Sequence, residues 1–255
     1  MNALVPGKLI GCGVFETMRA CRGKVFAFDR HMQRLRLGYK ALKIKNPYSD
    51  EMMQRSFFEL IRKNRIKDAR VRFLVWLDMA GVHAAVAVEP YHPYAMMRYQ
   101  RGFKGMVYRP KDQGIFGLPR IKSIDYMEFA KGQRLAKKKG LDEAILINSK
   151  EEIVEGSRTN IFCIHQRVLL TPALYCGCLD GITRQVVMRI AYAMNLNCRE
   201  ERLPLERLCA ADEAFVTNSL MGIMPLSFVG RHKIGSGKAG PLTIKMMKQY
   251  ANMAV

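Results

Sequence analysis

The sequence predicts a mixed α/β protein built from two lobes. Segments with a helical period of apolar residues, and segments in which apolar and polar residues alternate, occur in both halves of the 255-residue chain. They follow one another without a strict strand–helix–strand rhythm, which favours mixed sheets over a regular doubly wound sheet. A stretch rich in Pro and Gly at 109–119 interrupts both periodicities. We therefore expect a small N-terminal domain over 1–110, a linker over 111–120 and a larger C-terminal domain over 121–255.

The N-terminal half is predicted to contain two helices followed by a pair of strands. Apolar residues recur every three or four positions over 29–43, as on the buried face of a helix, and again over 49–64. Ser49 is a suitable N-cap for the second helix, because its hydroxyl can accept a hydrogen bond from a backbone N–H of the first turn. Residues 69–78 alternate between apolar and polar, which predicts a strand, and 84–88 is its expected antiparallel neighbour.

The C-terminal half is predicted to contain three helices and four strands. Gly140 ends the first helical pattern, and glycine is the preferred residue just after a helix C-terminus. The expected helices are 124–139, 183–194 and 242–250. The expected strands are 143–147, 159–165, 168–171 and 213–217.

Composition and charge exclude several classes of protein. With 49% hydrophobic and 25% charged residues, the chain has the composition of a globular protein and not of a disordered one. Seven scattered cysteines match neither a secreted disulfide framework nor a zinc site, so we expect reduced thiols, no metal and a cytoplasmic location. The apolar runs are too short to span a bilayer, and no membrane association is expected. The formal net charge of +20 favours anionic ligands.

A basic nucleic-acid-binding protein is the remote alternative that this charge leaves open. The most basic segments are 30–45 and 131–139, where Lys and Arg alternate with apolar residues at helical spacing, as on the solvated face of a helix. No aromatic stacking platform, zinc finger or RNA-binding motif accompanies them. We therefore expect a small-molecule ligand and no nucleic-acid partner.

Four segments carry residues with a joint chemical use. Lys122 follows the linker, and a lysine that loses its proton on desolvation can form a Schiff base. A carboxylate such as Glu155 can keep a pyridine nitrogen protonated, which makes the ring an electron sink. Thr183 opens a helix after Gly181, which is expected to let the chain turn sharply, and free N–H groups at a helix start bind phosphate. Ser219, in a second turn of small residues, can supply another hydroxyl and amide to the same anion.

Each of these segments alone has a simpler explanation, as a surface lysine, a turn or an ordinary capped helix. Together with two segments of the N-terminal half they resemble, in order and over about residues 8–245, the class IV aminotransferase family, the fold type IV pyridoxal-phosphate enzymes. That family includes branched-chain aminotransferases, D-amino-acid transaminases and aminodeoxychorismate lyases. The matching segments are GCGVFETMR (11–19), DRHMQRL (29–35), EGSRTNIF (155–162), LDGITR (179–184) and TNSLMGIMP (217–225).

The resemblance implies that the protein binds pyridoxal 5'-phosphate between the two lobes of a fold type IV architecture. It makes Lys122 the catalytic residue, which forms the Schiff base with the cofactor. Glu155 would pair with the pyridinium nitrogen, and Tyr126 would hydrogen-bond the ring oxygen. The implied phosphate ligands are Arg34, Ile182, Thr183 and Ser219, the second and third largely through backbone N–H groups.

The implied reaction is the transfer of an amino group between an amino acid and a 2-oxo acid by a homodimer. Aminodeoxychorismate lyase, which releases pyruvate and 4-aminobenzoate, is the alternative, because both reactions require the same cofactor residues. Arg19 and Arg72 are candidates to bind a substrate carboxylate, although a surface pair on adjacent strands explains them almost as well. Leu220 and Met221 are further candidates for substrate contacts.

Several positions depart from the family pattern. Cys12 stands where an Asp is usual. Asn160 is preceded by Arg158 and Thr159, where branched-chain aminotransferases typically carry Gly-Glu, and this argues against that subfamily. The Arg-x-His pair of D-amino-acid transaminases is not evident after Trp76.

Overall fold

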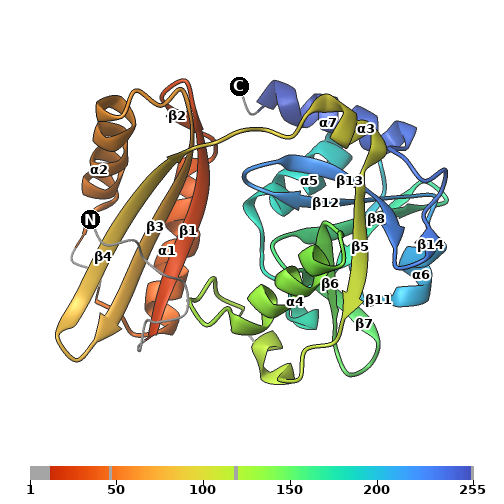
Figure 1. The fold of residues 1–255 in the computed structure, drawn as a ribbon, viewed down its shortest axis with the longest axis horizontal. Coiled ribbons are helices and arrows are strands. Elements are labelled where there is room, and N and C mark those ends of the chain that lie inside the picture. The colour runs from red at the N-terminus through yellow and green to blue at the C-terminus, as the bar shows by residue number, and fades with distance from the viewer. Residues whose placement is uncertain (1–11, 46–47, 118–119, 254–255) are drawn as a thin grey trace. The chain divides into compact units, whose positions relative to one another are not determined.

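The protein has a mixed α/β architecture, as the sequence predicts (Figure 1). This computed structural model describes residues 12–45, 48–117 and 120–253. Gly11, the first residue of the GCGVFETMR segment, lies outside the described residues, as do 118–119 of the expected linker.

The chain folds into two compact units, each with its own hydrophobic core. Unit 1 comprises the described residues up to His92 together with Ile121–Met127, and unit 2 comprises those of Pro93–Arg120 and Glu128–Val255. This division differs from the expected one. Residues 93–110 belong to unit 2, because the strand β5 (Phe103–Tyr108) pairs within the second sheet. Lys122, expected in the C-terminal domain, belongs to unit 1.

An antiparallel sheet, with four strands among the described residues, forms the frame of unit 1. Its strands are β1 (Cys12–Cys21), β2 (Lys24–Val25), β3 (Asp68–Asp78) and β4 (Gly81–Pro90), in the order β2-β1-β3-β4. The predicted strand 69–78 is confirmed as β3, and the predicted strand 84–88 is the central part of β4. β1 pairs with β3 along its whole length, from Cys12 opposite Leu77 to Cys21 opposite Asp68.

One face of this sheet is covered by α1 (Phe28–Ala41) and α2 (Asp50–Lys63), which are the two predicted helices. The Ser49 hydroxyl accepts a hydrogen bond from the Met52 N–H at 3.2 Å, so the predicted N-cap is confirmed. Alternate residues of β1 and β3 point into the core beneath the helices, because successive side chains of a strand face opposite ways. These core residues are Val14, Met18, Val71, Phe73 and Val75, which pack with Met32, Leu35 and Phe57 of the helices.

Unit 2 is built around a mixed sheet that has ten strands among the described residues. The strands are β5, β6 (Glu143–Ile147), β7 (Glu152–Gly156), β8 (Asn160–His165), β9 (Val168–Pro172), β10 (Cys198–Glu201), β11 (Leu203–Pro204), β12 (Glu213–Asn218), β13 (Gly222–Val229) and β14 (His232–Lys233). Their order is β10-β9-β8-β12-β13-β5-β6-β7-β11, with β14 beside β13. All four strands predicted for the C-terminal half are present, as β6, β8, β9 and β12.

Three longer helices and several short ones accompany this sheet. They are α3 (Met96–Arg101), α4 (Met127–Lys138), α5 (Ile182–Ala193), α6 (Leu205–Cys209) and α7 (Pro241–Met253), with the short 3-10 helices η1 (Gln113–Phe116) and η2 (Leu174–Cys176). The predicted helix 124–139 is wrong at its start, because Ser123 and Ile124 pair with β1 in extended conformation and α4 begins only after them. The predicted helices 183–194 and 242–250 are confirmed as α5 and α7.

Two of the strands that the sequence analysis missed, β7 and β13, lack the usual strand pattern. β7 is buried along nearly its whole length, so it shows no alternation of polar and apolar residues, and Glu155 lies on this strand and not in a turn. β13 contains Pro225, and proline is unfavourable within a paired strand. Both strands are recognisable only from their neighbours in the sheet.

The closing helix α7 is capped by a side chain from the sheet. The Glu213 carboxylate, at the start of β12, accepts hydrogen bonds from the N–H groups of Leu242 at 3.0 Å and Thr243 at 2.7 Å. These N–H groups lie in the first turn of α7, where no intrahelical partner exists. Gly240 provides the space for this contact, since a Cβ there would lie 2.2 Å from the Glu213 Cδ.

We expect the Glu213→Ala variant to be destabilised by about 1–3 kcal/mol, because it leaves two N–H groups at a buried helix end without an acceptor. Urea unfolding followed by circular dichroism measures this loss. Glu206→Ala, which removes an exposed carboxylate from α6, is the matched control and should stay within about 0.5 kcal/mol of wild type. An unchanged midpoint for Glu213→Ala would mean that water satisfies these N–H groups equally well.

Candidate active site

Lys122 is held against β1 by backbone pairing. The Phe15 N–H donates to the Lys122 carbonyl at 3.0 Å, and the Ile124 N–H donates to the Gly13 carbonyl at 3.0 Å. These two bonds enclose an antiparallel bridge between Val14 and Ser123. The backbone of the predicted catalytic lysine is therefore fixed by regular strand geometry.

The Phe15 ring is a platform for two predicted cofactor residues. The Lys122 Nζ lies 4.5 Å from the centroid of the Phe15 ring, within the range of a cation–π interaction. The Tyr126 ring meets Phe15 edge-on, with centroids 6.0 Å apart and an interplanar angle of 82°. Phe15 was not among the predicted site residues, although it lies in the segment GCGVFETMR.

Arg34 is tied to a buried carboxylate, Glu16, on the opposite face of β1. The Arg34 Nε and Nη2 donate to the two Glu16 oxygens at 2.8 and 2.7 Å, and the His31 Nδ1 lies 2.8 Å from the Glu16 Oε2. Burial raises the pKa of Glu16, but Arg34 and His31 outweigh this effect and lower it to about 2. Burial lowers the pKa of His31 despite its bond to Glu16. Glu16 thus fixes the orientation of the predicted phosphate ligand Arg34.

The two candidate carboxylate-binding arginines differ in their surroundings. Arg19 donates to both oxygens of Asp68, at 3.0 and 2.5 Å, so its guanidinium is already engaged by a carboxylate. Arg72 lies opposite Thr17 and not opposite Arg19, whose partner in the register is Arg70. Within the described parts of the chain, the Arg72 side chain forms no ion pair or hydrogen bond. Arg72 is the better candidate for a substrate carboxylate.

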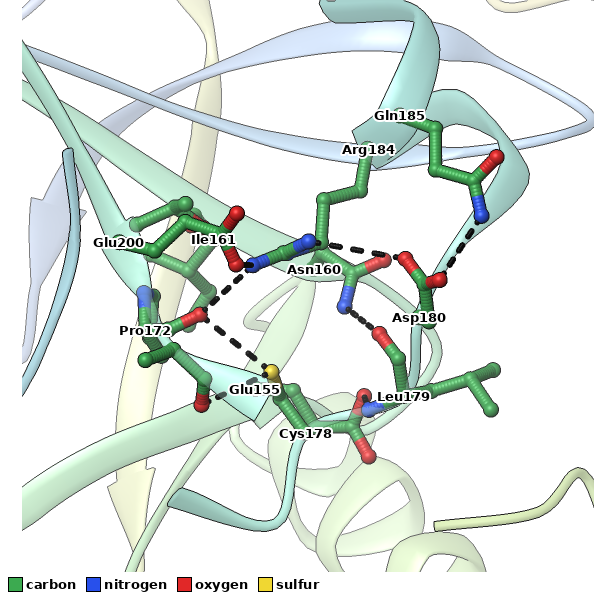
Figure 2. Close-up of polar contacts among 12 residues, drawn as sticks. Glu155, Asn160, Ile161, Pro172, Cys178, Leu179, Asp180, Arg184, Gln185 and Glu200 are labelled. Carbon is green, nitrogen blue, oxygen red and sulfur yellow. Dashed lines mark hydrogen bonds and ion pairs between the residues drawn. The ribbon is translucent and has the colours of Figure 1, made fainter. Parts of the chain in front are cut away.

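Glu155 lies buried on β7 in unit 2, where it accepts a backbone hydrogen bond. Its Oε2 accepts from the Leu179 N–H at 3.1 Å (Figure 2). Its Oε1 lies 3.6 Å from the Arg120 Nε, and the Arg120 guanidinium lies 4.7 Å from the centroid of the Phe129 ring. Arg120 keeps a positive charge beside the carboxylate that was predicted to face a pyridine nitrogen.

The N-terminus of α5 has the features of an anion site. Ile182 and Thr183 begin the helix and are both buried, and no side chain of the described residues caps its first N–H groups. The hydroxyls of Thr183 and of Thr217, on the adjacent strand β12, are buried and have no hydrogen-bond partner among the described residues. Uncapped N–H groups and unpartnered buried hydroxyls fit the oxygens of a phosphate. This end of unit 2 therefore fits the phosphate of the predicted cofactor.

Gly181 has a different role from the one predicted. Its φ of −71° and ψ of 139° are ordinary extended values that any residue adopts, so glycine is not required for a sharp turn. A Cβ at this position would lie 1.9 Å from the Asn160 Oδ1. Glycine is required because the Asn160 side chain packs directly against it.

Ser219, Leu220 and Met221 form the turn between β12 and β13. The Asn218 Oδ1 accepts hydrogen bonds from the N–H groups of Leu220 and Met221, both at 3.0 Å, which fixes the turn. The Met221 side chain is buried in the hydrophobic core of unit 2, and its contact with a substrate stays a prediction. Ser219 and Leu220 are partly buried.

Several further features concern the described residues as a whole. None of the helices over 12–45, 48–117 and 120–253 is long and apolar enough to cross a membrane. No group of three or more His, Cys, Asp or Glu side chains in that part of the chain could hold a metal ion. All seven cysteines are free thiols.

Comparison with known proteins identifies the family. A profile of the family Amino-transferase class IV matches residues 13–229. A putative branched-chain-amino-acid aminotransferase of Methanocaldococcus jannaschii is 31% identical, over 97% of this chain and 88% of that protein. An aminodeoxychorismate lyase of Bacillus subtilis is 30% identical, also over 97% of this chain and 88% of that protein.

A solved structure shares the fold. The crystal structure of the T.th. branched-chain amino acid aminotransferase with pyridoxamine 5'-phosphate has a TM-score of 0.88 at 24% sequence identity, and the match covers 96% of this chain and 86% of that chain. Since the profile covers most of the sequence and the relatives match it almost end to end, the chain belongs to the class IV aminotransferase family.

Proposed function

We propose that the protein is a pyridoxal-phosphate-dependent aminotransferase that moves an amino group between an amino acid and a 2-oxo acid. The observation that carries this proposal is the setting of Lys122, whose backbone pairs with β1 and whose Nζ lies 4.5 Å from the Phe15 ring centroid. Membership of the class IV aminotransferase family supports it. The solved branched-chain amino acid aminotransferase with pyridoxamine 5'-phosphate supports the choice of cofactor.

The residues that the family resemblance implies would hold the cofactor. The phosphate ligands would be Arg34, the N–H groups of Ile182 and Thr183, and Ser219. Glu155 would face the ring nitrogen, and Tyr126 would donate to the ring oxygen. When bound, pyridoxal phosphate supplies a conjugated ring that accepts the electron pair left on the substrate Cα.

The residues of the chain would position the substrate and move its proton. Lys122 would attach the cofactor in the resting enzyme and then carry a proton to and from the substrate Cα through its Nζ. Arg72 would bind the substrate carboxylate, because its register position lies next to the pair formed by Phe15 and Leu74 on the same face of the sheet. We further propose a homodimer, which sedimentation equilibrium tests.

An aminodeoxychorismate lyase is the second candidate function. The Bacillus subtilis lyase matches this chain at 30% identity, which is close to the 31% of the putative aminotransferase. Lyase and aminotransferase would use the same lysine and the same cofactor. They differ in whether a ring substrate loses pyruvate or a 2-oxo acid accepts the amino group.

A panel of substrates separates the two functions. The purified protein is mixed separately with L-amino acids, D-amino acids and aminodeoxychorismate, and cofactor absorbance and pyruvate release are followed. We expect an amino acid to convert the cofactor to its amino form, and a 2-oxo acid to restore it. Pyruvate released from aminodeoxychorismate without an amino acceptor would make the protein a lyase, and no spectral change with any substrate would contradict both functions.

Replacement of Lys122 tests the catalytic assignment. We expect Lys122→Ala to abolish turnover and the covalent attachment of the cofactor by borohydride, because no other amine would be held at its aldehyde. Peptide mapping of the reduced wild-type protein identifies the modified lysine. Lys137→Ala, which removes an exposed lysine of α4, should retain full activity. A cofactor attached to a lysine other than Lys122 would contradict the assignment.

Arg34 should contribute both to the stability of the fold, through its ion pair with Glu16, and to the binding of the cofactor phosphate. In the protein without cofactor, Arg34→Ala should cost about 3–5 kcal/mol at pH 7, because Glu16 is fully buried and would lose its main partner. The folded-state pKa of Glu16 is about 2 against an ordinary value of 4.5, so its stabilisation is present above pH 4.5 and is lost as the pH falls toward 2. Glu16→Gln should remove this acid dependence. Urea unfolding at several pH values measures both effects.

The double variant separates the two contributions of Arg34. Adding Arg34→Ala to Glu16→Gln leaves no buried charge unpaired, so the second change should cost much less stability than it does alone. Any further loss of pyridoxal phosphate affinity between Glu16→Gln and the double variant then measures the phosphate contact. Equal affinities would show that Arg34 serves only to neutralise Glu16.

A further inference from the structure

We infer that Asn160 is a positioning residue that couples Glu155 to the N-terminus of α5 through the backbone of residues 178–181. The inference rests on the proposed function, in which Glu155 faces the ring nitrogen and α5 binds the phosphate of one cofactor. Asn160 itself touches neither group. It acts through Leu179 and Gly181, which lie between η2 and the first residue of α5.

Leu179 is held on both of its backbone polar groups (Figure 2). Its N–H donates to the Glu155 Oε2 at 3.1 Å, and its carbonyl accepts from the Asn160 Nδ2 at 2.7 Å. These groups belong to two successive peptide planes, and the backbone has only two soft dihedrals between them. The conformation of Leu179 is therefore set jointly by Glu155 and Asn160.

The same asparagine side chain also contacts the start of α5. Its Oδ1 occupies the space where a Gly181 Cβ would lie, only 1.9 Å away. Gly181 is the N-cap position, directly before Ile182. One side chain thus limits both the residue that reaches Glu155 and the residue directly before the helix.

Asn160 has a rigid base from which to do this. It lies on β8 and pairs with Thr217 of β12, in the interior of the sheet order. It is only 6% exposed. A displacement of 178–181 would therefore come from the segment and not from Asn160.

The other residues of this segment, and Arg184 of α5, are anchored independently of Asn160 (Figure 2). The Cys178 Sγ lies 3.4 Å from the Pro172 carbonyl, and the Asp180 Oδ2 accepts from the Gln185 Nε2 at 2.9 Å. The fully buried Arg184 donates to the Pro172 carbonyl at 3.1 Å and to Glu200 at 2.5 Å. Loss of Asn160 should consequently loosen Leu179 and Gly181 without unfolding the unit.

The first experiment does not depend on the cofactor. Hydrogen exchange by NMR is compared for the wild type and Asn160→Ala, both without pyridoxal phosphate. We expect the amides of Leu179, which donates to Glu155, and of Gln185, which donates to the Gly181 carbonyl at 3.0 Å, to exchange about tenfold faster in the variant, as the loss of one hydrogen bond implies. Asn148→Ala, which removes the side chain that holds the turn between β6 and β7, should leave these amides unchanged. Unchanged exchange at Leu179 in Asn160→Ala would overturn the inference, whatever the protein binds.

A second experiment uses the holoenzyme and measures the effects at Glu155 and at the proposed phosphate site separately. Glu155→Gln should alter the pH dependence of the cofactor absorbance, and Ser219→Ala should weaken pyridoxal phosphate binding. Asn160→Ala should do both, with affinity reduced about tenfold. If Asn160→Ala lowers only the melting temperature, its role is structural and the inference fails.

Gly181→Ala provides a test by rescue. When Asn160 is present, the methyl group introduced by Gly181→Ala would collide with the Asn160 Oδ1. This variant should therefore bind pyridoxal phosphate more weakly than the wild type. In the Asn160→Ala background the space is open, and the same change should have no further effect. Additive losses would contradict the coupling. A wild-type protein that binds no pyridoxal phosphate would refute the proposed function, and the exchange experiment would still decide the role of Asn160.

Discussion

The second edge of β1 imposes the constraint on which unit 1 depends. Among the described residues, one edge of this strand is paired with β3 throughout, whereas the other edge meets β2 only at Ala20 and Cys21. Backbone groups at the remaining part of a strand edge need partners. The chain supplies them by returning from unit 2 and pairing Lys122 and Ile124 with Phe15 and Gly13. The position of the lysine thus follows from the completion of a sheet edge, and the delayed start of α4 follows from the same pairing.

The alternation of side chains along β1 separates two kinds of chemistry. Phe15 points to one face of the sheet, where it meets Lys122 and Tyr126. Glu16 points to the other face, beneath the helices, where Arg34 and His31 satisfy its carboxylate. Burial of the Glu16 carboxylate costs free energy. In this position, however, the carboxylate holds the long, flexible Arg34 guanidinium in one orientation. Neighbouring residues of a single strand therefore organise the amine and the candidate anion ligand.

The sequence predicted the periodic elements well and the special contacts poorly. Helices such as α2 and α5 were placed because their apolar periodicity and first-turn residues are local properties. The start of α4 was wrong because a long-range strand pairing competes with the helix there. The sequence analysis singled out Gly181 as the site of a sharp turn, whereas the structure requires glycine there to leave space for the Asn160 side chain. That reason could not be predicted locally, because Asn160 lies 21 positions earlier in the chain. The burial of the Met221 side chain was not expected, because nothing in a turn sequence shows which side chains turn back into the core.

The capping of α7 by Glu213 gives the last described helix a dependence that its own sequence does not show. The first turn of α7 contains no acidic residue. Its first N–H groups find their acceptor only after β12 has joined the sheet, because the carboxylate belongs to the first residue of that strand. An isolated helix of this length is marginal in water. During synthesis and folding, α7 is therefore expected to become stable only after the sheet has formed. A change that displaces β12 should also destabilise α7.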